Sequence, residues 1–241
     1  MTIDSTKLHT LKIKIFSSES LIPLSTRENY PHFNFHEPVK SGDVITSIDD
    51  HTHIIAILDT NTTSGPAISS GEIIDALRCG IKIYGASEIG AIRAKECGEM
   101  GMLGVGKIFD YLNRSFSFNQ DWPYEDVPGS GFSYMDILFS LEKINNLEDH
   151  TKNEFLKKYE LIHYSQRNLK TLENLFEDQH NLDHFFINGF PSQKKDDAAL
   201  LLRTIQKDIG LIQKLNEELW EKQKQQFNES KCDLKWRSLH E

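Results

Sequence analysis

Apolar residues in the first half of the chain fall into short runs separated by polar and glycine-containing segments. Three runs predict strands, because they alternate with polar residues or are rich in β-branched ones: residues 12–16, 54–58 and 81–84. Helices are predicted at residues 43–48 and, after the cap residue Ser69, around Ile73, Ile74 and Leu77 up to Gly80. Residues 20–38, rich in Pro, Asn, His and Phe, predict a long loop.

The second and third of these strands, with the helix between them, predict a βαβ unit with parallel strands and a right-handed crossover. Parallel strands end at the same edge of a sheet, and Asp59 follows one strand while residues 85–87 follow the other. We therefore expect these two places to be neighbours, at the edge where open α/β sheets usually bind ligands.

After Val127 the pattern becomes almost entirely helical. A turn cluster at residues 128–131 precedes three helical stretches: residues 133–145, 149–178 and 193–227. The last begins after a Ser192 cap and carries an apolar stripe at three- and four-residue steps. The chain is thus predicted to be an α/β protein, with an N-terminal parallel-sheet α/β core over residues 1–127. A C-terminal α-helical lobe with a frayed tail is predicted over residues 128–241.

Composition narrows the function classes. The chain has 241 residues, 38% hydrophobic and 26% charged, which is typical of a globular protein. A net charge of −9 argues against general nucleic-acid binding. Neither a membrane span nor a secretion signal is recognised. Three cysteines without C-x-x-C spacing indicate neither a disulfide framework nor a thiolate zinc site. We expect a cytoplasmic protein with no metal, cofactor, nucleic-acid or membrane partner.

The segment Gly85-Ala-Ser-Glu-Ile-Gly90 is the strongest candidate site. A strand, a glycine turn and a helix starting at Ser87 bring free backbone N–H groups and the positive helix end together. Ser87, with Gly85, Ala86 and Glu88, is therefore a candidate for holding an anion or a developing negative charge. Alternatively, Ser87 is only the N-cap and the glycines serve packing. The segment is one residue too long for the G-x-S-x-G of serine hydrolases.

Two charged residues extend this candidate site. Arg93 lies on the predicted helix and is expected to orient a carboxylate, unless it forms an ion pair with Glu96 or Glu99. Asp59 is expected to position water or act as a base, unless it is an ordinary turn residue. Residues 101–106 (GMLGVG) have the wrong order for a nucleotide-binding loop and predict a close-packed turn.

These motifs resemble those of the TfuA-like family, whose members read G-A-S-S-M-G-A-L-R-A-A-E and then G-M-x-G-x-G-x-I-F. The matching segments here are residues 57–59, 71–74, 85–96 (GASEIGAIRAKE) and 101–109 (GMLGVGKIF). Residues 15–18 and 41–43 also resemble family segments, and weaker matches follow at residues 164–167 (YSQR) and 193–198 (QKKDDA). Two places depart from the pattern. Thr60 replaces a family glycine, and the acidic motif is reduced to residues 125–127.

The resemblance implies an accessory protein that acts with a YcaO-type cyclodehydratase or thioamide synthetase on a ribosomally made precursor peptide. Such a protein would assist backbone thioamidation, or an azoline-type modification, by releasing or delivering sulfur from a thiocarboxylated ThiS-like carrier. The matches at residues 164–167 and 193–198 imply that Arg167 and Lys194 bind substrate. Two other readings stay open: a non-catalytic scaffold that docks a YcaO enzyme, and an unrelated small-molecule hydrolase.

Overall fold

The computed structural model describes residues 11–49, 52–60, 66–115, 133–144, 147–163, 166–175 and 192–212. Its centre is a five-stranded sheet with the order β2-β1-β3-β4-β5, in which every pair of neighbours is parallel. The strands are β1 (Lys12–Phe16), β2 (Phe33–His36), β3 (Thr52–Ile57), β4 (Lys82–Gly85) and β5 (Leu103–Gly104). The α/β fold and the parallel βαβ unit are confirmed.

Both edge strands were missed by the sequence prediction. Strand β2 lies inside the stretch expected to be a long loop, which also contains the short helix α2 (Leu24–Arg27). Strand β5 has two residues and lies inside the expected glycine turn. Edge strands are short and pair on one side only, so they have a weak hydrophobic signature. The three strands predicted correctly are the central ones, which are buried on both faces.

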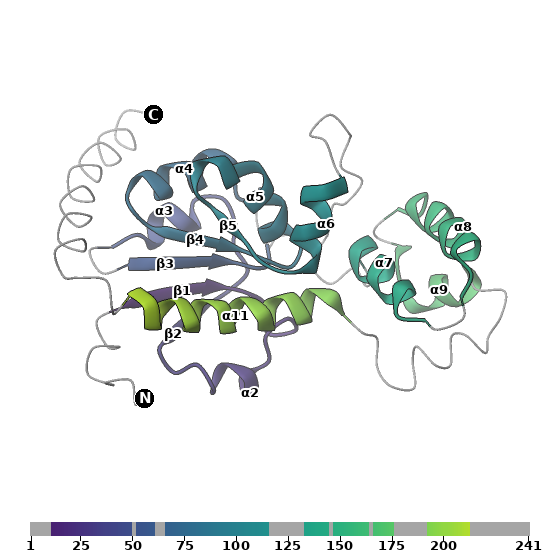
Figure 1. The fold of residues 1–241 in the computed structure, drawn as a ribbon, viewed down its shortest axis with the longest axis horizontal. Coiled ribbons are helices and arrows are strands. Elements are labelled where there is room, and N and C mark those ends of the chain that lie inside the picture. Colours follow the sequence, from purple (N-terminus) through teal and green to yellow (C-terminus); the bar gives the residue numbers. More distant parts are fainter. Residues whose placement is uncertain are drawn as a thin grey trace.

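Helices cover both faces of the sheet (Figure 1). One face packs against α3 (Asp43–Ser47), α4 (Ser70–Arg78) and α5 (Ile89–Cys97). Helix α4 begins where expected, because the Ser69 side chain accepts a hydrogen bond from the backbone N–H of Glu72 at 3.2 Å. The other face packs against the segment around α2 and against helix α11 (Gln193–Ile212), which comes from the far end of the sequence. The sheet is therefore the middle of three layers.

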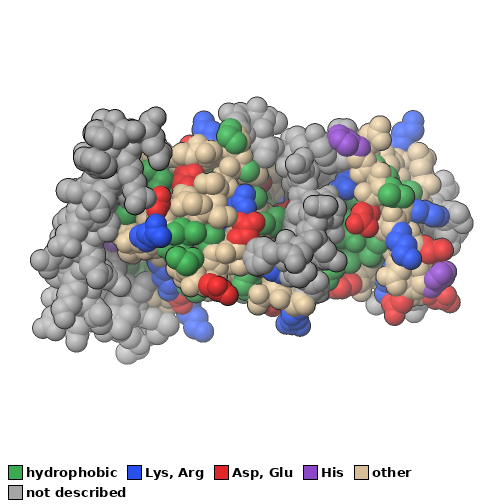
Figure 2. Space-filling view, turned by 90° about the horizontal axis from the view of Figure 1, so that it is seen from above, with side chains coloured by type: hydrophobic (Ala, Val, Ile, Leu, Met, Phe, Trp, Pro, Cys, Tyr) green, Lys and Arg blue, Asp and Glu red, His purple; other side chains and the backbone are tan. Residues whose placement is uncertain are grey.

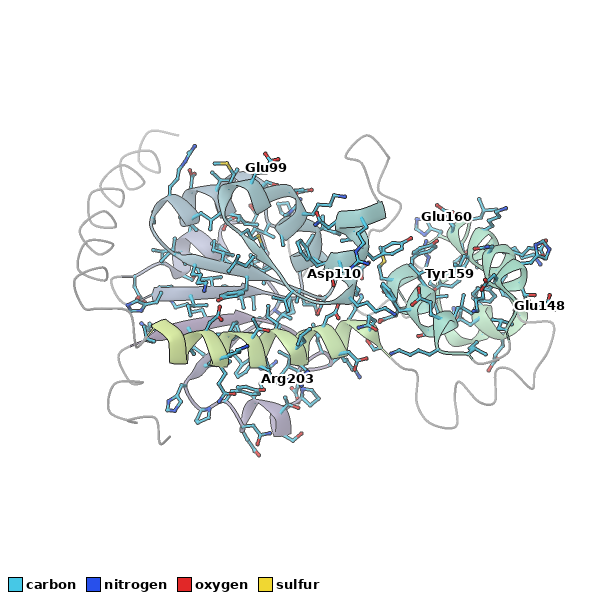
Figure 3. The ribbon with its side chains drawn as sticks, viewed as in Figure 1. Glu99, Asp110, Glu148, Tyr159, Glu160 and Arg203 are labelled. Carbon is cyan, nitrogen blue, oxygen red and sulfur yellow. The ribbon has the colours of Figure 1, made fainter. Side chains whose placement is uncertain are left out.

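Helix α11 lies along the sheet through the apolar stripe that its sequence predicted. The residues of that stripe are fully buried against β1, β3 and β4: Ala198, Leu201, Leu202, Ile205 and Ile209. Arg203 points away from the sheet on the opposite side of the helix (Figure 3). Near the end of α11, Asp208 forms an ion pair with Lys82 at 2.9 Å and accepts a hydrogen bond from the Tyr84 hydroxyl. The chain thus returns to the α/β core after its helical segment.

Beyond α5, further helices begin against the sheet layers and extend away from them as a helical lobe (Figure 1). Helices α6 (Lys107–Ser115), α7 (Tyr134–Glu142), α8 (Asp149–Glu160) and α9 (Leu169–Leu175) share a third apolar cluster, which also includes Ala91 of α5. The helical stretch predicted at residues 149–178 holds two helices, α8 and α9, in its described part. The predicted domain boundary at Val127 lies outside the described residues and stays a prediction. Residues 213–227 of the last predicted helix also lie outside the described part.

The surface carries charges of both signs. On the face formed by α4 and α5, acidic and basic side chains are interspersed (Figure 2). No helix among the described residues has the length and apolar character needed to cross a membrane.

Candidate functional site

The turn between β4 and α5 is tightly constrained. Ser87 has a φ of 64°, and it is the only non-glycine residue with a positive φ in the described part of the chain. Gly85 and Gly90 allow this turn because backbone passes where side chains would be. A Cβ on Gly85 would lie 2.0 Å from the Gly90 carbonyl oxygen, and one on Gly90 would lie 1.9 Å from the Ile57 carbonyl oxygen. A left-handed serine costs free energy and persists only where its surroundings fix it.

The N-cap interpretation of Ser87 is wrong. Helix α5 begins at Ile89, and its N-cap is Glu88, whose side chain makes no capping hydrogen bond. Ser87 therefore stands in the turn itself, between strand and helix. This strand–turn–helix path, with a left-handed serine between close-packed glycines, resembles in shape the nucleophile elbow of α/β-hydrolases, despite the extra residue.

The first turn of helix α11, residues 192–197, covers this serine. The Ser87 hydroxyl donates a hydrogen bond to the Lys194 carbonyl oxygen at 2.9 Å, and Ser87 has no exposed surface. The Lys194 ammonium forms an ion pair with Oε2 of Glu88, the residue after Ser87. Glu88 is 5% exposed, and its Oε1 has no hydrogen-bond partner among the described residues. The structure therefore brings together three predicted site residues, Ser87, Glu88 and Lys194.

Asp136 of helix α7 fixes that turn from the other side. Its Oδ1 accepts hydrogen bonds from the Ser192 hydroxyl at 3.0 Å and from the Lys194 backbone N–H at 3.2 Å. Burial raises the pKa of Asp136 to about 6; these hydrogen bonds oppose the rise, and the nearby Glu88 charge adds to it. Two buried carboxylates thus lie near Lys194, one from the β4–α5 turn and one from the helical lobe.

Asp59 lies at the end of the neighbouring strand, as predicted. Ile57 of β3 pairs with Gly85 of β4, so Asp59 and Ser87 each lie two residues beyond that last pair. Asp59 is half-buried, and its Oδ1 accepts the Thr60 backbone N–H at 2.9 Å. No hydrogen bond joins the Asp59 and Ser87 side chains in the described structure. Thr60, which departs from the family pattern, donates its hydroxyl hydrogen bond to the Val39 carbonyl at 2.6 Å.

Arg93 and Arg167 are bound to the protein itself. Arg93 donates from Nε to the Ile68 carbonyl at 2.8 Å and pairs with Glu96, which is the ion pair considered as the alternative from sequence. Arg167 is 5% exposed and donates to the Ile162 carbonyl at 3.0 Å. Neither arginine is seen to bond Ser87.

Arg167 still belongs to the electrostatic surroundings of the site. Its guanidinium lies over the ring of Tyr159, 5.2 Å from the ring centroid. Tyr159 lies inside the helical lobe (Figure 3). Burial raises the pKa of Tyr159, the Arg167 charge lowers it, and the charges of Asp136 and Glu88 raise it further. The lobe therefore places one buried cation within the field of the two carboxylates near Lys194.

The glycine-rich loop before helix α6 is filled by a carboxylate of the chain. Asp197 accepts the backbone N–H groups of Lys107 and Ile108, each at 2.9 Å, so it binds the first turn of α6. Gly106 has a φ of 106°, and a Cβ there would lie 2.3 Å from Cγ of Asp197. The expectation of a close-packed turn rather than a phosphate loop agrees with this arrangement.

Asp136, Ser192 and Asp197 were not predicted as site residues from the sequence. Asp136 had only a local signal, since Ser133 accepts its backbone N–H in a helix cap. Nothing in a single sequence indicates that its carboxylate meets residues 56 and 58 positions further on. Among the described residues, no group of three or more His, Cys, Asp or Glu side chains is placed to hold a metal ion.

Comparison with known proteins supports the sequence resemblance. Residues 59–123 match the family model described as TfuA-like protein, a range that includes the β4–α5 turn and the α6 loop. The resemblance seen in the motifs is thereby confirmed. A search of curated proteins gave no match.

Proposed function

With residues 59–123 assigned as TfuA-like, we propose that this protein assists a YcaO enzyme in modifying a ribosomally made peptide. Its part in the reaction is to release sulfur from a thiocarboxylated carrier, for use in thioamidation or an azoline-type modification. The partners are the YcaO enzyme, its precursor peptide and a ThiS-like carrier, and the compartment is the cytoplasm. The observation that supports this proposal is Ser87, held in a left-handed turn beside Lys194.

The chemistry follows from those two residues. The Ser87 oxygen attacks the carbonyl carbon of the thiocarboxylate and forms an ester, while the carbon–sulfur bond breaks and sulfide leaves. The Ser87 proton goes to the departing sulfur, so that hydrosulfide leaves, and the Lys194 ammonium stabilises its negative charge. Water then cleaves the ester and returns the carrier carboxylate and the Ser87 hydroxyl. A serine ester formed and then hydrolysed in this way is a known form of nucleophilic catalysis.

Three other residues support the reaction in this proposal. The backbone N–H groups of Ser87 and Glu88 stabilise the negative charge that develops on the carbonyl oxygen. Asp59, at the end of the neighbouring strand, positions the hydrolytic water. Arg93 acts from within the protein, since its hydrogen bond to the Ile68 carbonyl ties α5 to the segment before α4.

The test is sulfide release from a ThiS-like protein that carries a C-terminal thiocarboxylate. We expect Ser87→Ala and Lys194→Ala to lower the release rate by about a hundredfold or more, because each removes a group of the reacting pair. Lys195→Ala is the matched control, since Lys195 is the exposed neighbour of Lys194 and should change the rate less than about twofold. Binding of the YcaO enzyme, measured with the same variants, should be unchanged.

Two outcomes favour the other functions. Peptide modification that proceeds at the full rate with Ser87→Ala would support a scaffold, in which the helical lobe docks the YcaO enzyme and the serine is structural. Turnover of simple esters by the purified protein, without carrier or YcaO enzyme, would support a small-molecule hydrolase.

A further inference from the structure

The serine of the proposed reaction is closed off in this structure. Ser87 has no exposed surface, and the Lys194 carbonyl occupies the hydrogen-bonding position of its hydroxyl. A reacting carbonyl carbon must come within about 3–3.5 Å of the serine oxygen. The first turn of α11 must therefore move before any acyl group can reach Ser87.

This turn differs from the rest of its helix in what holds it. From Ala198 to Ile209, α11 is buried by its apolar stripe against the sheet. Residues 192–197 are held by polar contacts instead. Asp136 bonds Ser192 and Lys194 at the start of the turn, and Asp197 binds the α6 N–H groups at its end. The start of the turn can open without removing the apolar stripe from the sheet.

The closed turn also contains an unfavourable interaction. Asp136 and Glu88 are both carboxylates, both at least nine-tenths buried, and each bonds a different part of Lys194. Oε1 of Glu88 has no hydrogen-bond partner among the described residues. A buried carboxylate with an unsatisfied oxygen and a like charge nearby raises the free energy of the closed arrangement.

We infer that residues 192–197 form a lid over Ser87 and that Asp136, from the helical lobe, is the latch that keeps it closed. The role of the lid in sulfur release rests on the proposed function, because it matters there only if Ser87 is the reacting group. The lid itself can be tested without any reaction. Asp136 acts through the turn and is therefore a positioning residue.

The experiment measures access to position 87 in the full-length protein. Ser87→Cys introduces a thiol under the lid, and its alkylation by iodoacetamide at pH 8 is followed by mass spectrometry of the labelled peptide. Buried Cys97 in the α/β core reports global unfolding in the same sample. We expect slow alkylation of the introduced thiol in Ser87→Cys alone. Adding Asp136→Ala should raise that rate by about tenfold or more while Cys97 stays protected, because two hydrogen bonds to a charged acceptor are lost.

Two further variants measure how much each contact of Asp136 contributes to keeping the lid closed. Asp136→Asn keeps an oxygen that can accept both hydrogen bonds, so the alkylation rate should stay within about threefold of the parent. Ser192→Ala removes one donor to Asp136 and should give a rate between those of the Asn and Ala variants.

Any of three results would contradict the lid proposal. They are rapid alkylation in Ser87→Cys alone, no increase in the alkylation rate with Asp136→Ala, or equal increases in rate at position 87 and at Cys97. Failure of the proposed function has a different signature, namely no sulfide release by the unmodified protein although the alkylation rates follow the expected order.

Discussion

Two strand-to-helix turns lie next to each other in this protein and differ in what occupies them. The β4–α5 turn and the β5–α6 turn both contain glycines that a Cβ would disrupt. At the second turn, Asp197 binds the free N–H groups of α6 and fills the space beside Gly106. At the first turn, no side chain caps α5, and Ser87 stands in a left-handed conformation beneath Lys194. A carboxylate of α11 binds the helix N–H groups at one turn, whereas at the other a backbone carbonyl of α11 accepts the serine hydroxyl.

The comparison shows that a glycine-rich turn does not by itself indicate a ligand site. Each turn leads from a strand of the same sheet to the N-terminus of a helix, so the backbones of both turns have the same capacity to hold negative charge. The difference comes from helix α11, which sends a carboxylate to one turn and a carbonyl and an amine to the other. Substitutions at the two turns should therefore have different consequences.

The largest effect is expected from Gly90→Ala at the first turn. The new Cβ would lie 1.9 Å from the Ile57 carbonyl oxygen, so strand β3 and helix α5 would have to separate. We expect a loss of about 3 kcal/mol or more in the free energy of unfolding, measured by urea denaturation. Gly98→Ala is the matched control, since it meets nothing within 4 Å at a helical φ of −60° and should be neutral or slightly stabilising. Equal stability of the two variants would show that the close approach at Gly90 is not required.

A smaller loss is expected from Asp197→Ala at the second turn. It leaves the N–H groups of Lys107 and Ile108 without their acceptor, and because that of Ile108 is buried, the loss should be about 2 kcal/mol in the free energy of unfolding. The neighbouring Asp196→Ala removes only an exposed ion pair with Lys143 and should cost less than about 0.5 kcal/mol. The urea midpoints of both variants give the comparison, and an equal shift would contradict a capping role for Asp197.

The smallest predicted effect is a pH dependence of the free energy of unfolding. It comes from Asp136, whose carboxylate links the helical lobe to the turn of α11 above Ser87. The pKa of Asp136 rises from 3.8 to about 6 on folding, so the protonated form favours the folded state. This contribution is full below pH 4 and is lost as the pH rises through 6, which amounts to about 1 kcal/mol between pH 5 and pH 8. Asp136→Asn cannot ionise, so its free energy of unfolding should gain about 1 kcal/mol relative to the unmodified protein over that interval. Urea denaturation at both pH values measures it, and a constant difference would refute the raised pKa.

The central part of the fold was predictable from local pattern. Buried β-branched runs marked β1, β3 and β4, Ser69 marked the start of α4, and the stripe of α11 marked the face that packs on the sheet. The edge strands β2 and β5 were not predicted, because a strand that pairs on one side only has a weak hydrophobic pattern in the sequence. The break between α8 and α9 was not predicted either, because both segments favour a helix.

The candidate site was predictable only as a location. The strand, the glycines and Ser87 in order were enough to indicate a polar turn at the sheet edge, since these features depend on neighbouring residues. The left-handed conformation of Ser87, its burial and its hydrogen bond to Lys194, 107 positions away, were decided by the tertiary structure. Local pattern sets period and turn, whereas a contact over such a separation exists only once the apolar stripe of α11 has fixed that helix against the sheet.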